Sequence, residues 1–354
     1  MPIRRKANEQ KGWCTMKIIV DAFGGDNAPL EIVKGSAMAV AEYGVDIVLT
    51  GDETVIRKIA GDNGISLHRM EIVHASQVMD MNAEPTEILK GYNDSSMAVG
   101  LKLLSEGKGD AFVSAGSTGA FVVGASLIVK RIKGIKRAAL APVIPTVEGR
   151  YMLIDCGANA ECRPEMLVQF GLMGSAYMNK IMEVGTPRVA LINNGVEEHK
   201  GAPLQQEAYQ QLKGSPLHFV GNIEARQLPL GGCDVAVCDG FTGNIVLKLT
   251  EGLSKALIGQ IKDILMKNTM TKLAALTLKG GLGEFKKKMD YKEYGGAALL
   301  GISKPTIKAH GSSDAKAFKN AIGQAIRFTS QDVIGVIEGY LAEMKAKEQG
   351  AENA

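Results

Sequence analysis

Polar, glycine-containing loops follow several short apolar runs of the sequence. They read Asp-Ala-Phe-Gly-Gly-Asp at 21–26, Ser-Ala-Gly-Ser-Thr-Gly at 114–119, Asp-Cys-Gly-Ala-Asn at 155–159 and Asp-Gly-Phe-Thr-Gly-Asn at 239–244. A strand, a loop and a helix in succession direct the N–H groups of the helix start toward the C-terminal edge of a parallel sheet, which favours an anion there. We therefore expect these loops to converge on one site of the size of a phosphate.

The second of these loops offers the best donors for a phosphate. Its hydroxyls and main-chain N–H groups can hold an anion without a charged side chain, and the glycine pair of the first loop lets the main chain approach a ligand closely. The candidate phosphate-binding residues are Ser114, Gly116, Ser117, Thr118, Gly24, Gly25 and Asp26. The alternative for both loops is a tight turn in which a side chain caps the following helix.

Several cofactor and metal motifs are absent from the sequence. There is no Gly-x-Gly-x-x-Gly dinucleotide fingerprint, no Gly-x-x-x-x-Gly-Lys-Ser/Thr loop, and no His-Glu-x-x-His or Cys/His cluster. The five cysteines form no Cys-x-x-Cys pair, so we expect reduced thiols in a cytosolic protein. We therefore predict neither a cofactor nor a metal.

Apolar strands alternate with amphipathic helices along most of the chain. The pattern predicts strands at 17–20, 46–50, 71–74, 111–113, 151–154, 188–192, 217–220 and 234–238, and helices at 29–43, 54–60, 95–105, 118–129, 164–182, 203–212, from 245 onward and at 314–347. This alternation is typical of a doubly wound, mostly parallel sheet. Because no linker interrupts it, residues 16–345 are expected to form a single α/β catalytic domain, with 1–15 as a disordered extension and 346–354 as a tail.

Positive charge gathers in two parts of the chain, although the formal net charge is only +3. Residues 1–15 carry a net +3, and residues 262–292 carry eight Lys against three acidic residues, a net +5, which leaves about −5 for the remainder. A basic strip on an acidic body suits an anionic lipid surface or an acidic partner better than it suits nucleic acid.

Apolar residues at helical spacing border the basic strip and predict an amphipathic helical hairpin at about 250–290. A first set is expected in the core or in a subunit contact: Leu253, Leu257, Ile261, Ile264 and Leu265. A second set, interrupted by three glycines that predict two short helices, is the candidate membrane contact: Leu273, Leu276, Leu278, Leu282 and Phe285. An apolar helix face flanked by Lys can lie in a lipid interface, whereas no apolar run is long enough to span a membrane.

Seven segments together resemble the bacterial phosphate acyltransferase family. They lie at 20–26, 112–119, 153–159, 221–226, 238–244, 294–301 and 310–313, and the resemblance runs from about Met16 to Lys345. The family commonly has Met and His where this chain has Phe23 and Asn27, and Asn where it has Ser117. A His at position 27 is therefore not a required base here. The resemblance implies transfer of a fatty acyl group from acyl-acyl carrier protein to inorganic phosphate, giving acyl-phosphate at the start of phospholipid synthesis.

The resemblance also implies the architecture and the assembly. It implies a Rossmann-like α/β/α sandwich similar to isocitrate and isopropylmalate dehydrogenases and to phosphotransacetylases. It further implies a homodimer in the cytoplasm, attached peripherally to an anionic membrane surface through the amphipathic hairpin.

Residue roles follow from the matching positions. Lys200 falls in the family's Glu-x-x-Lys-Gly segment and is implied to offset charge in catalysis, with Asn159 and Asn244 as hydrogen-bond partners. Three carboxylates are expected to orient loops or cap helices rather than act as bases: Asp21, Asp155 and Asp239. Because acyl carrier protein is acidic, basic residues should steer it, and the candidates are the cluster Arg131, Lys133, Lys136 and Arg137 and the run 286–288.

Three other functions are compatible with parts of this pattern. A phosphotransacetylase-like enzyme that uses coenzyme A would share the fold and the acyl-phosphate chemistry. A nicotinamide-dependent dehydrogenase would share the fold, but the sequence lacks its fingerprint. A non-catalytic membrane scaffold would use the basic hairpin, yet it would not need several anion-friendly loops.

Overall fold

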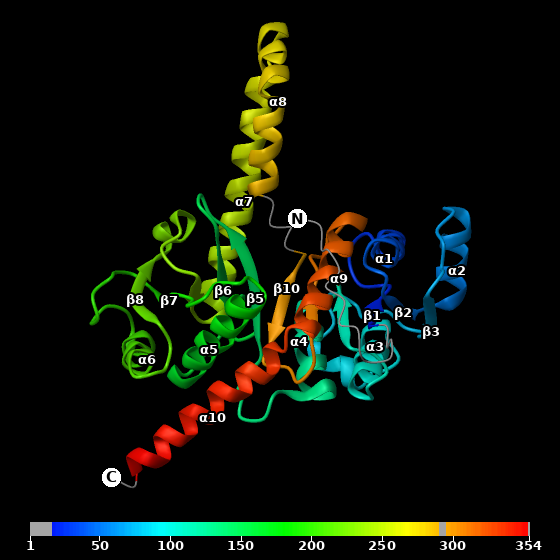
Figure 1. Cartoon of the computed structure of the whole chain (residues 1–354). Coiled ribbons are helices and arrows are strands. Elements are labelled where there is room, and N and C mark those ends of the chain that lie inside the picture. The colour runs from blue at the N-terminus through cyan, green and yellow to red at the C-terminus, as the bar shows by residue number, and fades with distance from the viewer. Residues whose placement is uncertain (1–15, 290–294, 353–354) are drawn as a thin grey trace, which may run out of the picture.

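The fold is organised around one sheet of eleven strands (Figure 1). The computed structural model describes residues 16–289 and 295–352. The strand order is β3-β2-β1-β4-β11-β10-β5-β6-β9-β7-β8. The strands are β1 (Lys17–Asp21), β2 (Asp46–Gly51), β3 (Met70–His74), β4 (Ala111–Ser114), β5 (Ala139–Pro145), β6 (Arg150–Ile154), β7 (Val189–Asn193), β8 (Phe219–Glu224), β9 (Val235–Val237), β10 (Ala297–Leu300) and β11 (Thr306–Lys308).

Helices cover both faces of this sheet. They are α1 (Leu30–Tyr43), α2 (Glu53–Asp62), α3 (Ser96–Ser105), α4 (Thr118–Gly124), α5 (Pro164–Lys180), α6 (Pro203–Lys213), α7 (Gly240–Leu265), α8 (Thr269–Met289), α9 (Ala315–Ser330) and α10 (Val333–Glu352). Alternate residues of β1 show the two layers, because Ile18 and Val20 belong to the cluster that includes α1 and α9, whereas Ile19 belongs to the one that includes α3 and α4. The predicted α/β/α sandwich with a mostly parallel sheet is thereby confirmed.

The sheet consists of two parallel wings that run in opposite directions. The first wing is β3-β2-β1-β4-β11 and the second is β6-β9-β7-β8. Between them β10 and β5 pair antiparallel to each other and to the wing strands beside them. Strand β5 pairs with β10 through Ala139–Pro142 and with β6 through Val143–Pro145. This stagger places the C-terminal ends of β4 and β6 at the same level of the sheet, with β11, β10 and β5 between them.

The sequence pattern did not predict the strands at the centre. Prolines at positions 142 and 145 lie within β5, and proline is uncommon inside strands because it cannot donate to the ladder. Strands β10 and β11 have only four and three residues, too few for a periodic pattern. The elements that join the wings were therefore missed.

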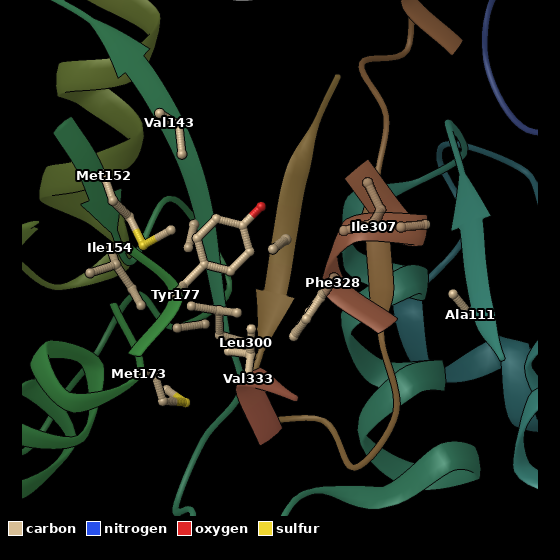
Figure 2. Close-up of a cluster of buried hydrophobic side chains, with 14 of the residues drawn as sticks. Ala111, Val143, Met152, Ile154, Met173, Tyr177, Leu300, Ile307, Phe328 and Val333 are labelled. Atoms are coloured by element: carbon tan, nitrogen blue, oxygen red, sulfur yellow. The ribbon is translucent and has the colours of Figure 1, made fainter. Parts of the chain in front are cut away.

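A buried tyrosine ties the two wings together (Figure 2). Tyr177 on α5 packs its ring edgewise on Phe328 of α9, with 5.7 Å between ring centroids. Its hydroxyl accepts a hydrogen bond of 2.8 Å from the Nε2 of Gln324. Burial raises the pKa of Tyr177 to about 12, so its hydroxyl stays neutral. Helices from both wings thus share one core.

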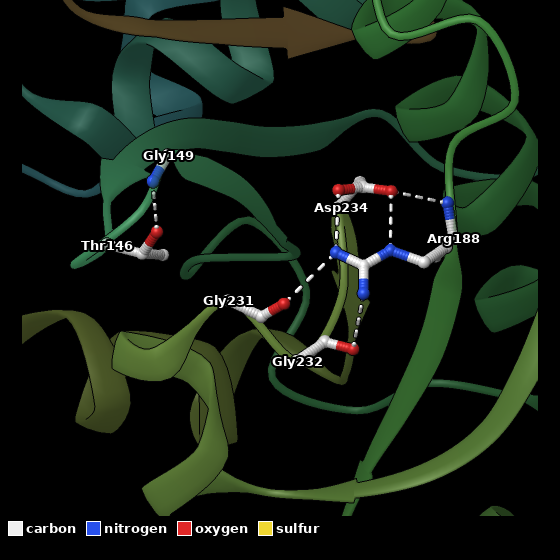
Figure 3. A network of polar contacts seen from close by, with 6 residues as sticks. All are labelled: Thr146, Gly149, Arg188, Gly231, Gly232 and Asp234. Atoms are coloured by element: carbon white, nitrogen blue, oxygen red, sulfur yellow. Dashed lines mark hydrogen bonds and ion pairs between the residues drawn. The ribbon is translucent and has the colours of Figure 1, made fainter.

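A charged network fixes the starts of β7 and β9 (Figure 3). Asp234 accepts hydrogen bonds from the guanidinium of Arg188 at 3.1 Å to each carboxylate oxygen, and from the Arg188 main-chain N–H at 2.8 Å. The guanidinium also donates to the carbonyl oxygens of Gly231 and Gly232. Because these starts are fixed together, the loops at the opposite ends of β7 and β9 also keep their relative positions.

Helices α7 and α8 pack on each other and project from the body as an arm (Figure 1). The first apolar set, predicted for the core or a subunit contact, is not in the core of this chain, because Leu253, Leu257, Ile261 and Ile264 are exposed and Leu265 is only half-buried. The subunit contact stays a prediction. The predicted pair of short helices is also wrong, since α8 continues through Gly280, Gly281 and Gly283 as one helix. In the described part of the chain, no helix is long and apolar enough to cross a membrane.

The boundaries of helices α7, α9 and α10 differ from the predictions. The expected helix 314–347 is divided into α9 and α10 around Asp332, which has a positive φ of 46°. Helix α10 continues to Glu352, into the predicted tail. Helix α7 begins at Gly240 rather than at Ile245, because the Asp239 side chain caps it by accepting from the Thr242 N–H at 2.8 Å. Residues 1–15, expected as an extension, lie outside the described residues.

Candidate active site

A cavity of about 360 Å³ lies where the two wings meet. We call it the central cavity. One part of its wall is polar and is formed by Gly116, Thr118, Asn244, Lys248, Glu251, Lys308 and His310. Another part is apolar and is formed by Leu140, Pro142, Val143, Ile144, Leu247 and Ala297. A polar and an apolar group joined in one molecule can therefore be held side by side.

A second cavity of about 270 Å³, which we call the side cavity, adjoins the first. Gly116 and Met81 line both. The side cavity is bordered by the first predicted loop, through Asp21, Gly24, Gly25 and Asp26. The structure therefore brings the first and second loops together, as their positions at strand ends predicted.

Asp21 is the centre of a buried hydrogen-bond network between these loops. Its carboxylate accepts from the hydroxyls of Ser96 at 2.6 Å and Ser114 at 2.7 Å, and from the Phe23 N–H at 3.2 Å. Burial raises the pKa of Asp21, and these hydrogen bonds oppose the rise. Because the Ser114 proton is directed to Asp21, and Ser114 lines neither cavity, this hydroxyl positions the loop rather than reaching into the central cavity.

The first loop is also fastened to the loop after β11. The Asp26 N–H donates to the Gly311 carbonyl oxygen at 2.8 Å, and the Asn27 side chain donates to that of Ser313 at 3.2 Å. Gly25 has a φ of +105°, and a Cβ there would meet the Gly311 oxygen at 2.9 Å. The close approach of the two loops therefore requires glycine at position 25.

Asp155 holds the third loop. Its carboxylate accepts from the N–H groups of Leu140, Ala158 and Asn159 and from the Asn159 side chain, at 2.6 to 3.3 Å. The Asn159 carbonyl oxygen in turn accepts from the Gly240 N–H at 2.7 Å, at the start of α7. This contact sets the position of Asn244, which lines the central cavity opposite Gly157.

Lys200, Asn159 and Ser117 do not line either cavity. Lys200 is half-buried in the loop after β7, where its carbonyl oxygen accepts from the Asn193 side chain at 3.0 Å. Asn159 uses its side chain within the protein, donating to the Ala138 carbonyl oxygen at 2.7 Å. Ser117 precedes α4 and is buried. Lys200 therefore has no place in the lining of either cavity.

Sequence reasoning missed two lysines of the central cavity. Lys308 ends β11 and is only 7% exposed, and its Nζ donates to the Ala309 carbonyl oxygen at 2.6 Å. Burial lowers its pKa to about 8, against the attraction of Asp21 and Asp26. Lys248 faces the cavity from α7 and forms an ion pair of 2.9 Å with Glu251. The sequence signal that could have revealed Lys308 was the family segment 310–313, because it marks the loop that directly follows this lysine.

The central cavity also contains a cysteine thiol. Cys156 lines the central cavity, but burial raises the pKa of its thiol well above the usual value, so it does not supply a thiolate nucleophile. Among the described residues, no group of three or more His, Cys, Asp or Glu side chains could hold a metal ion.

The predicted basic cluster Arg131, Lys133, Lys136 and Arg137 is exposed. It ends next to Ala138, whose carbonyl oxygen accepts a hydrogen bond from the Asn159 side chain. The side chains of 286–288 lie outside the described residues.

Comparison with known proteins finds relatives over most of the chain. The profile of a family described as "Fatty acid synthesis protein" matches residues 16–336. A phosphate acyltransferase from Alkaliphilus oremlandii is 51% identical over 319 residues, covering 90% of this chain and 95% of the relative. A phosphate acyltransferase from Thermoanaerobacter pseudethanolicus is 47% identical over 330 residues, covering 93% and 98%.

Solved structures share the fold at low identity. A phosphotransacetylase from Streptococcus pyogenes superposes with a TM-score of 0.61 at 19% identity, covering 91% of this chain and 94% of that one. A phosphotransacetylase from Staphylococcus aureus has a TM-score of 0.58 at 16% identity, covering 89% and 94%. These likenesses show the fold. The sequence identities above, which extend over nine-tenths of the chain, show the family: the chain belongs to the phosphate acyltransferase family.

Proposed function

We propose that this protein transfers a fatty acyl group from acyl-acyl carrier protein to inorganic phosphate, giving acyl-phosphate for phospholipid synthesis. The observation that carries this proposal is the central cavity, in which an apolar wall suited to an acyl chain adjoins a polar wall with two lysines. The relatives named phosphate acyltransferase support the same reaction.

In the proposed step an oxygen of hydrogen phosphate attacks the thioester carbonyl carbon. A carbon–oxygen bond forms, the carbon–sulfur bond breaks, and the phosphate proton ends on the leaving thiol. Near neutral pH much of the phosphate is already a dianion, judging by phosphoesters with a second pKa of about 6. The protein therefore needs to position phosphate and stabilise the developing oxyanion, for which one well-placed donor supplies about 3–4 kcal/mol.

The polar wall offers groups for both tasks. We assign Gly116 and Thr118 to the phosphate and the Asn244 amide to the carbonyl oxygen, because all three line the central cavity. Asp21, Asp155 and Asp239 act through the loops that they hold. Lys200 keeps its proposed role of offsetting charge, for which the support is its place in the Glu-x-x-Lys-Gly segment.

The reaction is tested by incubating the protein with a long-chain acyl-acyl carrier protein and phosphate, and trapping acyl-phosphate with hydroxylamine. Lys200→Ala is expected to lower kcat about 100-fold, as loss of one charge-stabilising group does, whereas Lys180→Ala, at the exposed end of α5 in the same wing, is the matched control with unchanged turnover. Near wild-type turnover of Lys200→Ala would remove Lys200 from the mechanism. Turnover of the coenzyme A thioester but not of acyl-acyl carrier protein would favour a phosphotransacetylase-like activity, the function of the fold neighbours.

We also propose that the arm mediates a homodimer and peripheral attachment to the cytoplasmic membrane face. Exposed apolar residues recur every fourth position along α7: Phe241, Ile245, Leu249, Leu253, Leu257 and Ile261. On α8, Leu273, Leu276 and Leu278 are exposed beside Lys272 and Lys279. The side chains of Leu282 and Phe285 lie outside the described residues. An apolar row on one helix and an apolar face with lysines on the other suit a subunit contact and a lipid interface, respectively.

Charge placed on the arm should separate the two roles. Leu276→Glu is expected to lower the fraction bound to anionic vesicles about tenfold, since burial of a Leu side chain contributes about 1.5–3 kcal/mol. Leu253→Glu is expected to reduce the solution mass to that of one chain. Leu230→Glu is the control because Leu230 is 67% exposed, as Leu276 is at 66%, but lies off the arm. Vesicle binding that Leu276→Glu leaves unchanged would contradict the role of the arm in membrane attachment. A wild-type protein that is monomeric in solution would contradict its role in a homodimer.

A further inference from the structure

Lys308 presents a chemical problem that the fold does not solve internally. An ammonium group carries three N–H donors, and the one hydrogen bond that this structure shows for Nζ goes to the Ala309 carbonyl oxygen. Across the described part of the chain, no carboxylate lies within the 4 Å of an ion pair with Lys308. A buried charge without a partner is costly, so such groups are normally paired or bind an ion.

The acidic groups near Lys308 act on it through space and not by an ion pair. Asp21 and Asp26 attract the ammonium through space. However, both oxygens of Asp21 accept hydrogen bonds from serine hydroxyls, and Asp26 is held in a loop fastened to Gly311. These carboxylates favour the charged lysine without neutralising it by direct contact, which leaves the ammonium available to a ligand.

A second cation faces the same space from the other side. Lys248 lines the central cavity from α7, where it is paired with Glu251 at 2.9 Å, and its charge disfavours that of Lys308. Two lysines that repel each other across a cavity attract an anion placed between them. Gly116, in the loop after β4, and Thr118, the first residue of α4, line the same wall, and β4 is hydrogen-bonded to β11 with Ser114 opposite Lys308.

We propose that Lys308 is the residue that binds the phosphate substrate in the central cavity, donating from its ammonium group to a phosphate oxygen, with Lys248 facing the same anion from α7. This rests on the proposed function for the identity of the anion. It gives phosphate a place beside the strand end of β4, next to the apolar wall that receives the acyl chain. The attacking oxygen then lies between the lysine pair and the thioester.

The test is direct binding of inorganic phosphate, measured by calorimetry without any thioester. Lys308→Met is expected to weaken phosphate binding about 30-fold or more, as truncation of a buried, hydrogen-bonded charge pair does. Lys308→Arg should retain binding within about tenfold. Lys248→Met should weaken binding less, because the Lys248 side chain is 58% exposed and screened by solvent.

A pH series isolates the lysine. The pKa of Lys308 of about 8 means that the empty site loses its charge as pH rises above that value, so wild-type affinity for phosphate should fall toward tenfold per pH unit above it. Lys308→Arg should remove this fall, since guanidinium keeps its charge. The other titratable or charged groups around the site are Asp21, Asp26, Lys248, Glu251 and His310, and all remain in that variant.

The outcomes separate this proposal from the proposed function. Phosphate binding by Lys308→Met equal to wild type, or no phosphate binding by wild type, would overturn the role of Lys308. Lysine-dependent phosphate binding without any acyl transfer would instead overturn the acyltransferase function and leave Lys308 as an anion site. Thermal unfolding guards against misfolding, because removing a buried unpaired charge should leave Lys308→Met at least as stable as wild type.

Discussion

Gly243→Ala should destabilise the protein by about 3 kcal/mol or more and abolish activity. A Cβ at this position in the first turn of α7 would fall against the carbonyl oxygen of Asp155, well inside van der Waals contact, and would meet the Cys238 sulfur at 3.0 Å. The obstructing atom is main chain in a loop held by four hydrogen bonds, so it cannot yield as a flexible side chain would. Urea-induced unfolding, followed by circular dichroism, measures the loss.

The same helix provides the matched control. A Cβ at Gly252 would meet no atom within 4 Å. Gly252→Ala should therefore stabilise the protein by about 0.5–1 kcal/mol, the ordinary gain of alanine over glycine in a helix. Equal stability changes for the two substitutions would show that α7 does not pack against the Asp155 loop as described here.

Asp155→Ala is expected to have the second large effect, a loss of about 3 kcal/mol or more in the free energy of unfolding. It would leave the N–H groups of Leu140 and Asn159 without their carboxylate acceptor, and each buried unsatisfied donor costs about 1–3 kcal/mol. The loop would also release Asn159, whose carbonyl oxygen positions the start of α7. Chemical denaturation measures the stability, and the hydroxylamine trap should show the accompanying loss of turnover.

A different aspartate calibrates this result. Asp239 caps α7 by accepting from the Thr242 N–H and hydroxyl, at 2.8 and 2.9 Å. Loss of a helix cap costs about 1 kcal/mol, so Asp239→Ala should be several times milder than Asp155→Ala. Similar losses for both would mean that Asp155 is only another cap.

The strand ends and their loops were readable from sequence for a physical reason. Each combines a β-branched or aliphatic run with glycine and a short polar side chain, and both features are local. The segments at 21–26, 114–119 and 155–159 do follow β1, β4 and β6. The fold class and the family, which depend on many such segments, were therefore predicted and are confirmed.

What could not be predicted depends on pairing between distant segments. Lys308 enters the site only because β11 lies beside β4, and three residues are too few for a pattern that signals a strand. Conversely, Lys200 belongs to a conspicuous segment but lines neither cavity. The glycines of α8 misled for a local reason: in an exposed helix each costs about 1 kcal/mol without ending it.

The position of β11 has a consequence for synthesis of the chain. Strand β4 receives this neighbour from a segment that follows roughly 190 residues later, which at 5–20 residues per second is about 10–40 s of translation. During that interval β4 is an open sheet edge, a template for pairing with other chains. Helix α9, which covers α1, is translated later still. The nascent N-terminal half therefore lacks the strand that protects this edge until almost the whole protein has left the ribosome.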